Sequence, residues 1–368
     1  LRARTPSAAR LTTFPLPFDD AIKVNQFQGV LPPDGEERVD EIIGLAINEA
    51  LVEAGLTEKE IAASAFILGN AGLIYEAEAL YRRQKARGMT DPPPLSGRGT
   101  GRVASRVGKR LGVKGPVLTI TTACTSSANA LLVAATMIKR GQVKRAIVLG
   151  IEFLNAFTLN GFYSLMLLSP EGCMPFDAAR HGLQLGEASA ALVLEGVSSP
   201  DAGDTVLCGW ANNCDTHNVI STSLDGRLVR KVMDTALDAA GIRASDIIAV
   251  KAHGTGSLDN DATEAAAMRL VFMEGTKGSG KVPPFTALKG CIGHTLGACG
   301  AIETVAFFKC LKKGFIPATM GFNDVDPDLG LSPLITARKP ENTGGFYMLN
   351  FFGFGGNNVS LILGYPTA

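Results

Sequence analysis

Strand-like and helix-like patterns of apolar residues alternate along the chain. Residues 118–124 form a short apolar, β-branched run that ends in a cysteine, and small hydroxyl residues follow it. Apolar side chains then recur at helical spacing until Gly141, at Ala128, Leu131, Leu132, Ala135 and Ile138. We therefore expect a buried strand that turns into a buried helix at Cys124. Because such units recur between abundant glycines, the pattern predicts an α/β fold.

Two pairs of segments resemble each other. Residues 50–69 and 236–254 both show a helix, an Ala-Gly turn, a short acidic capping segment and a buried strand. Residues 121–141 and 289–314 both show a turn with a reactive residue, then an apolar helix that ends in basic residues and glycine. Repeats at this spacing favour a duplicated α/β half over a solenoid, although helix–turn–strand units also look alike by chance.

The duplication predicts two halves. We expect residues 1–200 to form an N-terminal half that carries the cysteine nucleophile, and residues 201–368 to form a C-terminal half. The halves would join near the Pro-, Ser- and Gly-rich stretch 194–205.

Charge and composition exclude several classes of function. The 35 Lys and Arg residues balance the 35 Asp and Glu residues, so no overall basic field attracts nucleic acid or an anionic membrane. Apolar runs are too short to span a bilayer, and residues 1–20 lack the apolar middle of a secretory signal. We expect a cytoplasmic protein. The basic stretches 81–88 and 139–145 are either solvated helix faces or a local patch for an acidic protein partner.

The 7 cysteines show neither the spacing of a disulfide framework nor a C-x-x-C pair. The spacing of Cys291, Cys299 and Cys310 suits core packing better than zinc binding. We therefore predict no metal site.

Cys124 is the first candidate for chemistry. The thiolate is the reactive form, and a helix N-terminus lowers the pKa of a thiol, although position alone favours a structural cysteine. His253 and His294 change that balance, because each also lies in a Gly-rich turn before a helix. Such junctions meet at one end of an α/β sheet, where sites form. Lys289 adds a cation that can be partly buried, whereas His181 and His217 lack this setting and are assigned no role.

The stretch NFFGFGGNN, at residues 350–358, alternates glycines with aromatic residues. It is not a phosphate-binding loop, because it continues into a strand instead of a helix. Its glycines let backbone N–H groups approach a ligand, as an oxyanion hole requires. A plain turn before a terminal strand explains the pattern equally well.

Five motifs resemble those of the elongating β-ketoacyl-[acyl-carrier-protein] synthases, members of the thiolase superfamily. They are TTACTSSANAL around Cys124, MPFDAARHGLQLGEASAALVLE at 174–195, VKAHGTGSLDND around His253, KGCIGHTLGACGAIE around Lys289 and His294, and NFFGFGGNNVSLIL from residue 350. The similarity covers residues 39–364. One departure is that the first twenty residues lack the strand and Val-Thr-Gly-like turn with which the family opens, so the edge of the N-terminal half stays open.

The resemblance implies a thiolase-like fold of two duplicated α/β halves in α-β-α-β-α layers, and a homodimer or a heterodimer with a related synthase. It gives the nucleophile position to Cys124, the two histidine positions to His253 and His294, and the lysine position to Lys289. Further positions follow for residues that support the site (Phe354, Glu303 and Asp261, with Glu303 a candidate ion-pair partner of Lys289) and for residues that bind substrate (Thr255, Ser257 and Phe352).

The implied reaction is a decarboxylative Claisen condensation between malonyl-acyl carrier protein and an acyl group held on Cys124, with no cofactor. Backbone N–H groups of Cys124 and Phe354 would form the oxyanion hole. His253 and His294 would donate hydrogen bonds to the enolate, either as neutral Nε–H donors or as imidazolium. Two histidines distinguish the chain from starter condensing enzymes, which pair His with Asn. The late Gly-rich motif lacks the second cysteine of a thiolase.

Two alternatives remain open. The first is a non-elongating, chain-length-factor-like partner subunit of a heterodimer, although such partners usually lose the nucleophile. The second is a hydrolase, which would need an open water site where Phe352 and Phe354 indicate a dry one. Residues 153–168 either line an acyl tunnel at the dimer contact or belong to the core. The sequence leaves the acyl chain length open, and with it the choice among fatty acid, polyketide and polyene synthesis.

Overall fold

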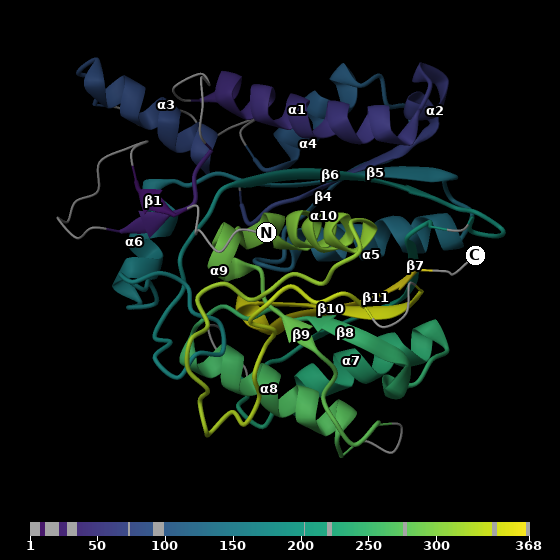
Figure 1. The fold of residues 1–368 in the computed structure, drawn as a ribbon. Helices are drawn as coiled ribbons and strands as arrows, with labels where there is room; N and C mark the ends of the chain where they lie inside the picture. The colour runs from purple at the N-terminus through teal and green to yellow at the C-terminus, as the bar shows by residue number, and fades with distance from the viewer. Residues whose placement is uncertain are drawn as a thin grey trace.

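The computed structural model describes residues 8–11, 22–27, 35–72, 74–90, 99–201, 203–218, 223–274, 278–340 and 344–365. Within these residues, two main sheets are stacked with helices between them and on their outer faces (Figure 1). A short hairpin of β1 (Ala9–Arg10) and β2 (Lys23–Val24) precedes the first helix. The predicted α/β fold in α-β-α-β-α layers is confirmed.

The first sheet has 4 strands in the order β4-β3-β5-β6. They are β3 (Ala65–Gly69), β4 (Val117–Ile120), β5 (Arg145–Glu152) and β6 (Ala188–Glu195). β3 runs parallel to both β4 and β5, whereas β6 runs antiparallel to β5. Every residue of β3 is buried, as expected for a central strand with helices on both faces.

The second sheet has 5 strands in the order β7-β11-β10-β8-β9. They are β7 (Val206–Cys214), β8 (Ile247–Lys251), β9 (Phe285–Thr286), β10 (Gly345–Gly353) and β11 (Asn357–Tyr365). β8 runs parallel to β9 and β10, and β11 runs antiparallel to β10.

The two sheets repeat one topology, which confirms the predicted duplication. β3 and β8 hold equivalent central positions, and they end the two segments 50–69 and 236–254 that resemble each other. The sheets differ at one edge: β7 pairs with β11, whereas no strand of the described residues pairs with the outer side of β6. This is the edge that the sequence left open. The domain boundary at residue 200 stays a prediction.

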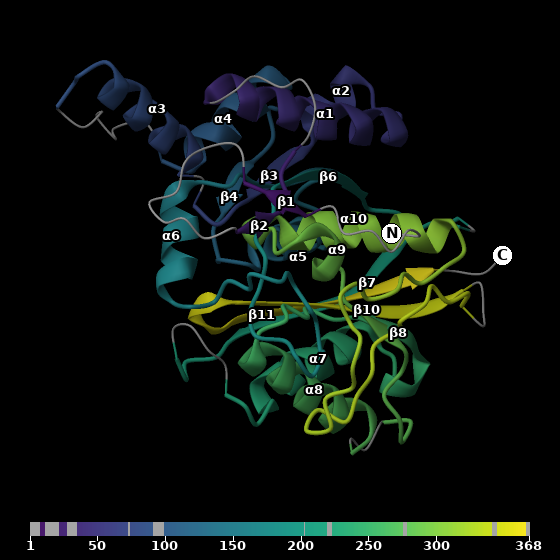
Figure 2. The same ribbon diagram turned by 60° about the vertical axis from the view of Figure 1, so that its left-hand side comes forward.

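Helices form the other layers (Figures 1 and 2). Over the outer face of the first sheet lie α1 (Glu36–Ala54), α2 (Glu58–Ala63) and α4 (Gly101–Arg110). Between the sheets lie α5 (Ser126–Lys139), α9 (Lys289–Ile292), η2 (Leu296–Ala298) and α10 (Cys299–Lys312). Below the second sheet lie α7 (Arg227–Ala240), η1 (Ala244–Asp246) and α8 (Leu258–Phe272). At one side lie α3 (Tyr75–Ala86) and α6 (Ala156–Ser164), and η3 (Phe354–Gly356) joins β10 to β11.

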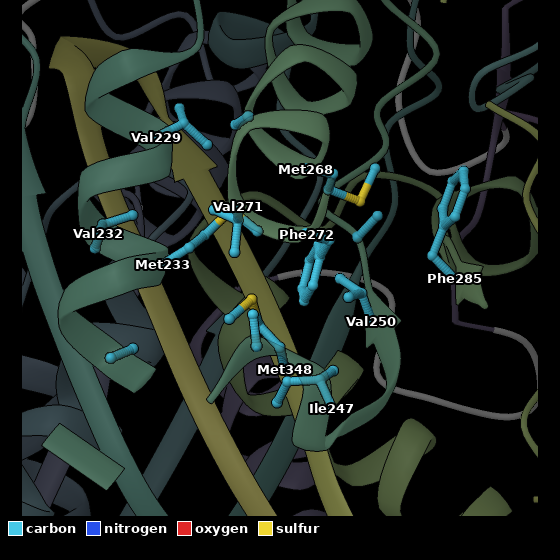
Figure 3. Packing of buried hydrophobic residues seen from close by; sticks show 14 of the residues in the cluster. Val229, Val232, Met233, Ile247, Val250, Met268, Val271, Phe272, Phe285 and Met348 are labelled. Carbon is cyan, nitrogen blue, oxygen red and sulfur yellow. The ribbon is translucent and has the colours of Figure 1, made fainter. Parts of the chain in front are cut away.

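The outer helices of the second half bury an apolar core against their sheet. Figure 3 shows valine, methionine and phenylalanine side chains of α7 and α8 facing residues of β8 and β10, among them Val232, Met233, Val271, Phe272, Val250 and Met348. Each such side chain contributes about 1.5–3 kcal/mol when it is fully buried. This core holds β8 in place, and β8 leads into the turn that contains His253.

In the described part of the chain, no helix is both long enough and apolar enough to cross a membrane.

The two central helices pack so closely that only glycine fits at one position. A Cβ atom on Gly300, in α10, would lie 2.0 Å from the backbone nitrogen of Ala128, in α5. Backbone cannot move aside as a flexible side chain can. The two halves are therefore joined through a contact that excludes even a methyl group.

Replacing Gly300 with Ala is expected to lower the free energy of unfolding by about 1–3 kcal/mol, because the added methyl group forces α5 and α10 apart. Chemical denaturation measures the change. Gly161→Ala in α6 is the matched control, since its Cβ would meet no atom within 4 Å. Equal stability of the two variants would show that the contact between the central helices is loose.

Candidate active site

Cys124 lies in the turn between β4 and α5, as the sequence predicted. The turn is tight: the residue before it, Ala123, has a φ of 50°. Ser126 holds it closed, because its Oγ accepts a hydrogen bond of 2.9 Å from the Thr122 N–H and donates one of 2.6 Å to the Ala123 carbonyl. The small hydroxyl residues after the cysteine are therefore part of the turn itself. Cys124 is buried, with 5% of its surface exposed.

A cavity of about 260 Å³ brings Cys124 together with His253 and His294. One part of its wall is polar and includes Thr255, Ser257, Asp259 and Asn260. Another part is apolar and includes Phe162, Met166, Leu167, Leu183, Phe352 and Phe354. The cavity thus joins a residue of the first half to two residues of the second, and it offers both polar and apolar side chains to a ligand.

His253 follows the end of β8 and is fixed from two sides. Its backbone N–H and that of Gly254 donate hydrogen bonds of 2.9 Å to the two carboxylate oxygens of Glu264, in α8. Lys289 donates to the His253 carbonyl at 2.8 Å and lies 3.1 Å from its Nδ1. No sequence pattern pointed to Glu264, which lies a helical turn beyond the motif and reaches back to it.

His294 lies between α9 and η2. Its backbone N–H donates to the Gln184 carbonyl at 2.6 Å, and its Nδ1 accepts the N–H of Leu296 at 3.1 Å. The Cys299 sulfur lies 3.2 Å from the same Nδ1. The rings of His253 and His294 are 5.4 Å apart between centroids and almost perpendicular, at 86°.

These contacts fix the chemical state of both imidazoles. Nδ1 of His294 faces a backbone N–H, and Nδ1 of His253 faces the Lys289 ammonium, so each Nδ1 acts as an acceptor. The hydrogen of each neutral ring then resides on Nε2. Burial, and after it the charge of Lys289, lowers the pKa of His253 and of His294 well below the ordinary value. The structure therefore favours neutral Nε2–H donors over imidazolium.

Lys289 and Glu303 form the predicted ion pair. The distance from Lys289 Nζ to Glu303 Oε1 is 2.6 Å, and neither side chain is exposed. Burial alone would lower the pKa of Lys289, but the Glu303 carboxylate reverses this effect and leaves the pKa raised. A second lysine that the sequence analysis missed, Lys251, contacts the other oxygen of Glu303 at 2.7 Å. Glu303 is thus an anion between two cations.

The expected activation of Cys124 by its helix is outweighed. Burial raises the pKa of the Cys124 thiol to about 11, while Lys289 and the backbone N–H groups of Phe354 and Cys124 act in the opposite direction. The expectation of a lowered pKa is therefore wrong, because the desolvation of the thiolate outweighs its stabilisation by these neighbours. Cys124 is a thiol at neutral pH.

The Gly-rich stretch 350–358 packs against Cys124. β10 ends at Gly353, where a Cβ atom would lie 3.0 Å from the Cys124 nitrogen. The backbone N–H groups of Phe354 and Cys124 both approach the sulfur. The ring of Phe354 stacks on Phe162 of α6, with centroids 5.5 Å apart. Of the two interpretations of this loop, close backbone donors beside the thiol therefore describe it better than a plain turn.

Asp261 shapes the loop that follows His253. Its carboxylate accepts the backbone N–H groups of Thr255 at 2.9 Å and of Phe176 at 2.7 Å. The hydroxyls of Thr255 and Ser257 lie 2.9 Å apart on the cavity wall. The loop can therefore present two hydroxyl groups to a polar ligand.

Two expectations are revised by the cavity. His181, to which the sequence analysis assigned no role, lies on the cavity wall. Residues 153–168 divide between core and cavity: Phe153, Leu154 and Leu159 are core residues, whereas Phe162, Met166 and Leu167 line the cavity. An acyl tunnel at a dimer contact stays a prediction. The residues described include no group of three or more His, Cys, Asp or Glu side chains arranged to hold a metal ion.

The raised pKa of Cys124 predicts a steep pH dependence of its alkylation. Because only the thiolate reacts, the rate with iodoacetamide is expected to increase about tenfold per pH unit above neutrality and to level off only near pH 11. Peptide mass spectrometry follows Cys124 separately from the exposed Cys214 in the same digest. A plateau reached below the ordinary thiol pKa would contradict the dominance of burial.

Known proteins resemble this chain over most of its length. Residues 24–199 match the family model "Beta-ketoacyl synthase, N-terminal domain", and residues 205–323 match "Beta-ketoacyl synthase, C-terminal domain". Nodulation protein E of Rhizobium sp. (strain N33) is 30% identical over 332 residues, which cover 86% of this chain and 80% of that protein. The mitochondrial 3-oxoacyl-[acyl-carrier-protein] synthase of Arabidopsis thaliana is 33% identical over 273 residues, or 70% of this chain and 58% of that protein.

Solved structures give the same result. The ishigamide ketosynthase/chain length factor has a TM-score of 0.84 at 25% identity and covers 99% of this chain and 93% of its own. A beta-ketoacyl synthase from Burkholderia phymatum STM815 has a TM-score of 0.82 at 25% identity, with the same coverage of 99% and 93%. The fold is thiolase-like, and the chain belongs to the beta-ketoacyl synthase family.

Proposed function

We propose that this chain is a condensing enzyme that joins an acyl group to a malonyl unit with loss of CO₂. One observation carries the proposal: a buried thiol and two neutral imidazole Nε2–H donors share a single cavity. The thiol can hold an acyl group, and the donors can stabilise an enolate. The relatives named as 3-oxoacyl-[acyl-carrier-protein] synthases support the same reaction class.

In the first step, the Cys124 sulfur attacks the carbonyl carbon of an acyl thioester on a carrier protein. A C–S bond to Cys124 forms, the C–S bond to the carrier breaks, and the proton of the thiol leaves with the free carrier thiol. The N–H groups of Cys124 and Phe354 face the carbonyl oxygen as it becomes negative. Burial disfavours the Cys124 thiolate, but acylation converts the sulfur into a neutral thioester. The thiolate therefore exists only transiently.

In the second step, the carboxylate of a malonyl thioester leaves as CO₂, and its electron pair becomes an enolate. The Nε2–H groups of His253 and His294 donate to the enolate oxygen. Because both rings are already neutral donors, no proton has to be rearranged before decarboxylation. Lys289, held by Glu303, keeps the His253 ring in this tautomer.

In the third step, the enolate carbon attacks the acyl carbon on Cys124. A C–C bond forms, the C–S bond to Cys124 breaks, and the sulfur regains a proton from solvent. The product is a β-ketoacyl thioester two carbons longer. Acyl-carrier, malonyl-carrier and one proton thus yield the product, free carrier thiol and CO₂.

The partners belong to the same proposal. Thr255 and Ser257 would bind the pantetheine arm of an acyl carrier protein, while the apolar wall would hold the acyl chain. Phe157 and Met166 are 68% and 86% exposed, and among the described residues no strand pairs with the outer edge of β4. A related subunit would cover these surfaces. Two similar structures are titled as ketosynthases with a chain length factor.

The second candidate is a non-elongating partner subunit, which those titles favour. The present chain has the full set of Cys124, His253, His294 and Lys289 around one cavity, which a subunit without chemistry would not need. The hydrolase alternative lacks support, because Phe352 and Phe354 line the cavity beside the thiol.

Incubation with an acyl-carrier protein is expected to acylate Cys124, and a β-ketoacyl product should form only when malonyl-carrier protein is added. Mass spectrometry identifies both species. Cys124→Ala should abolish the adduct. His294→Ala should leave acylation intact and slow decarboxylation by about 10²–10³, the usual effect of losing one such donor.

His217→Ala, at an exposed histidine outside the cavity, is the control and should retain full activity. The absence of any adduct would favour the partner subunit. Release of free acid without malonyl-carrier would favour a hydrolase.

A further inference from the structure

Lys251 is a buried cation that the reaction described above does not use. It is the last residue of β8, and it has no exposed surface. Neighbouring residues of β8 face opposite ways: Val250 packs in the outer core with α7 and α8, and Ala249 packs in the core between the sheets. The alternation of side chains along a strand directs Lys251 to the same inner side as Ala249, where α10 lies (Figure 1).

The Lys251 ammonium contacts a carboxylate, a backbone carbonyl oxygen and the face of an aromatic ring. Nζ lies 2.7 Å from Glu303 Oε2 and 2.6 Å from the Asn350 carbonyl oxygen. It also lies 3.6 Å from the centre of the Phe351 ring, where the face of the ring attracts a cation. These contacts fix the position of the charge.

The charges around Lys251 come from three elements. Glu303 lies on α10, Lys289 on α9 and Glu264 on α8. Glu303 alone can neutralise one of the two lysines, so Lys251 adds one positive charge to the Lys289–Glu303 pair. Glu264 offsets this charge in part, because burial raises its pKa to about 7. The field of Lys251 reaches the cavity, since it acts on both His253 and His294 in the same direction as Lys289.

We propose that Lys251 is a positioning residue for the condensation: it holds the second oxygen of Glu303, keeps Lys289 aimed at His253, and adds the positive charge that keeps both imidazoles neutral and stabilises the enolate. The inference rests on the proposed function, and it assigns a role to a residue outside the cavity wall. Lys251 acts through Glu303 and Lys289 and does not touch substrate.

The environment of Lys251 makes its charge sensitive to pH. Burial lowers its pKa to about 8, although the Glu303 carboxylate draws the pKa upward. Lys251 therefore loses its proton as the pH rises through about 8, whereas Lys289 stays charged. Stabilisation of the enolate should weaken in the same range.

The first readout is decarboxylation of a malonyl-pantetheine thioester from neutral to alkaline pH. The native enzyme is expected to lose rate with a midpoint near pH 8. Lys251→Met and the polar variant Lys251→Gln should decarboxylate the thioester more slowly at neutral pH, by about tenfold, which is the rate equivalent of an interaction worth one pKa unit. Both variants should also lack the alkaline decline. Lys231→Met, at an exposed lysine of α7, should behave as the native enzyme does. A native profile without the decline, or the same decline in both Lys251 variants, would overturn the proposal.

The second readout needs no activity and separates this inference from the proposed function. Between pH 8 and 10.5 the folded protein has released the Lys251 proton while the unfolded chain retains it, so stability rises with pH in this window. The unfolding free energy of the native protein should therefore rise with pH relative to that of Lys251→Met. If the difference in unfolding free energy between the two proteins stays constant with pH, the inference is overturned. If the difference rises with pH but no malonyl thioester is decarboxylated, Lys251 is a buried cation as described and the proposed function is wrong.

Discussion

The carboxylate of Glu303 lies between two ammonium groups in a part of the protein that water does not reach. Lys289 approaches one oxygen at 2.6 Å and Lys251 approaches the other at 2.7 Å, and none of the three is exposed. Burial opposes ionisation of all three groups, and the contacts of each lysine with Glu303 are the main effect that works against it. Removing one member of such a cluster typically costs about 3–5 kcal/mol, because the remaining charge is left buried without a partner. The tautomer of His253 and the neutrality of both histidines depend on this arrangement.

The fold supplies the arrangement by stacking two similar halves. The first half contributes Cys124 from the turn after β4, and the second contributes His253, Lys289 and His294 from the turns after β8 and β9. Glu303 lies on α10, which packs against α5 through the contact at Gly300. The relative position of thiol and imidazoles therefore depends on the packing of two helices that belong to different halves. A small change at that contact would shift the Cys124 thiol relative to the two imidazoles.

The sequence predicted the residues whose neighbours have a local signature. Cys124, His253 and His294 each lie in a turn of small residues, and the Lys289–Glu303 pair lies within one motif. Lys251 escaped prediction because it ends an apolar strand and its partner Glu303 is distant in the sequence. Glu264 escaped because it lies within an ordinary helix, and only the fold turns its carboxylate back to the N–H groups of His253 and Gly254. The raised pKa of Cys124 was not predicted for a related reason. A helix terminus is visible in the sequence, whereas the desolvation that outweighs it comes from apolar residues far apart in the sequence, such as Val24, Leu159 and Leu183, that cluster with Cys124.

Donors occupy Nδ1 of His253 and of His294, so both imidazoles should be neutral and carry their hydrogen on Nε2. Nitrogen NMR of the protein labelled with ¹⁵N-histidine reports tautomer and charge directly, and the exposed His181 and His217 provide reference signals. His253 and His294 are each expected to give the signals of one neutral Nε2–H tautomer throughout the neutral pH range. An imidazolium signal, or a hydrogen on Nδ1 of either ring, would show that these contacts do not set the state of the rings.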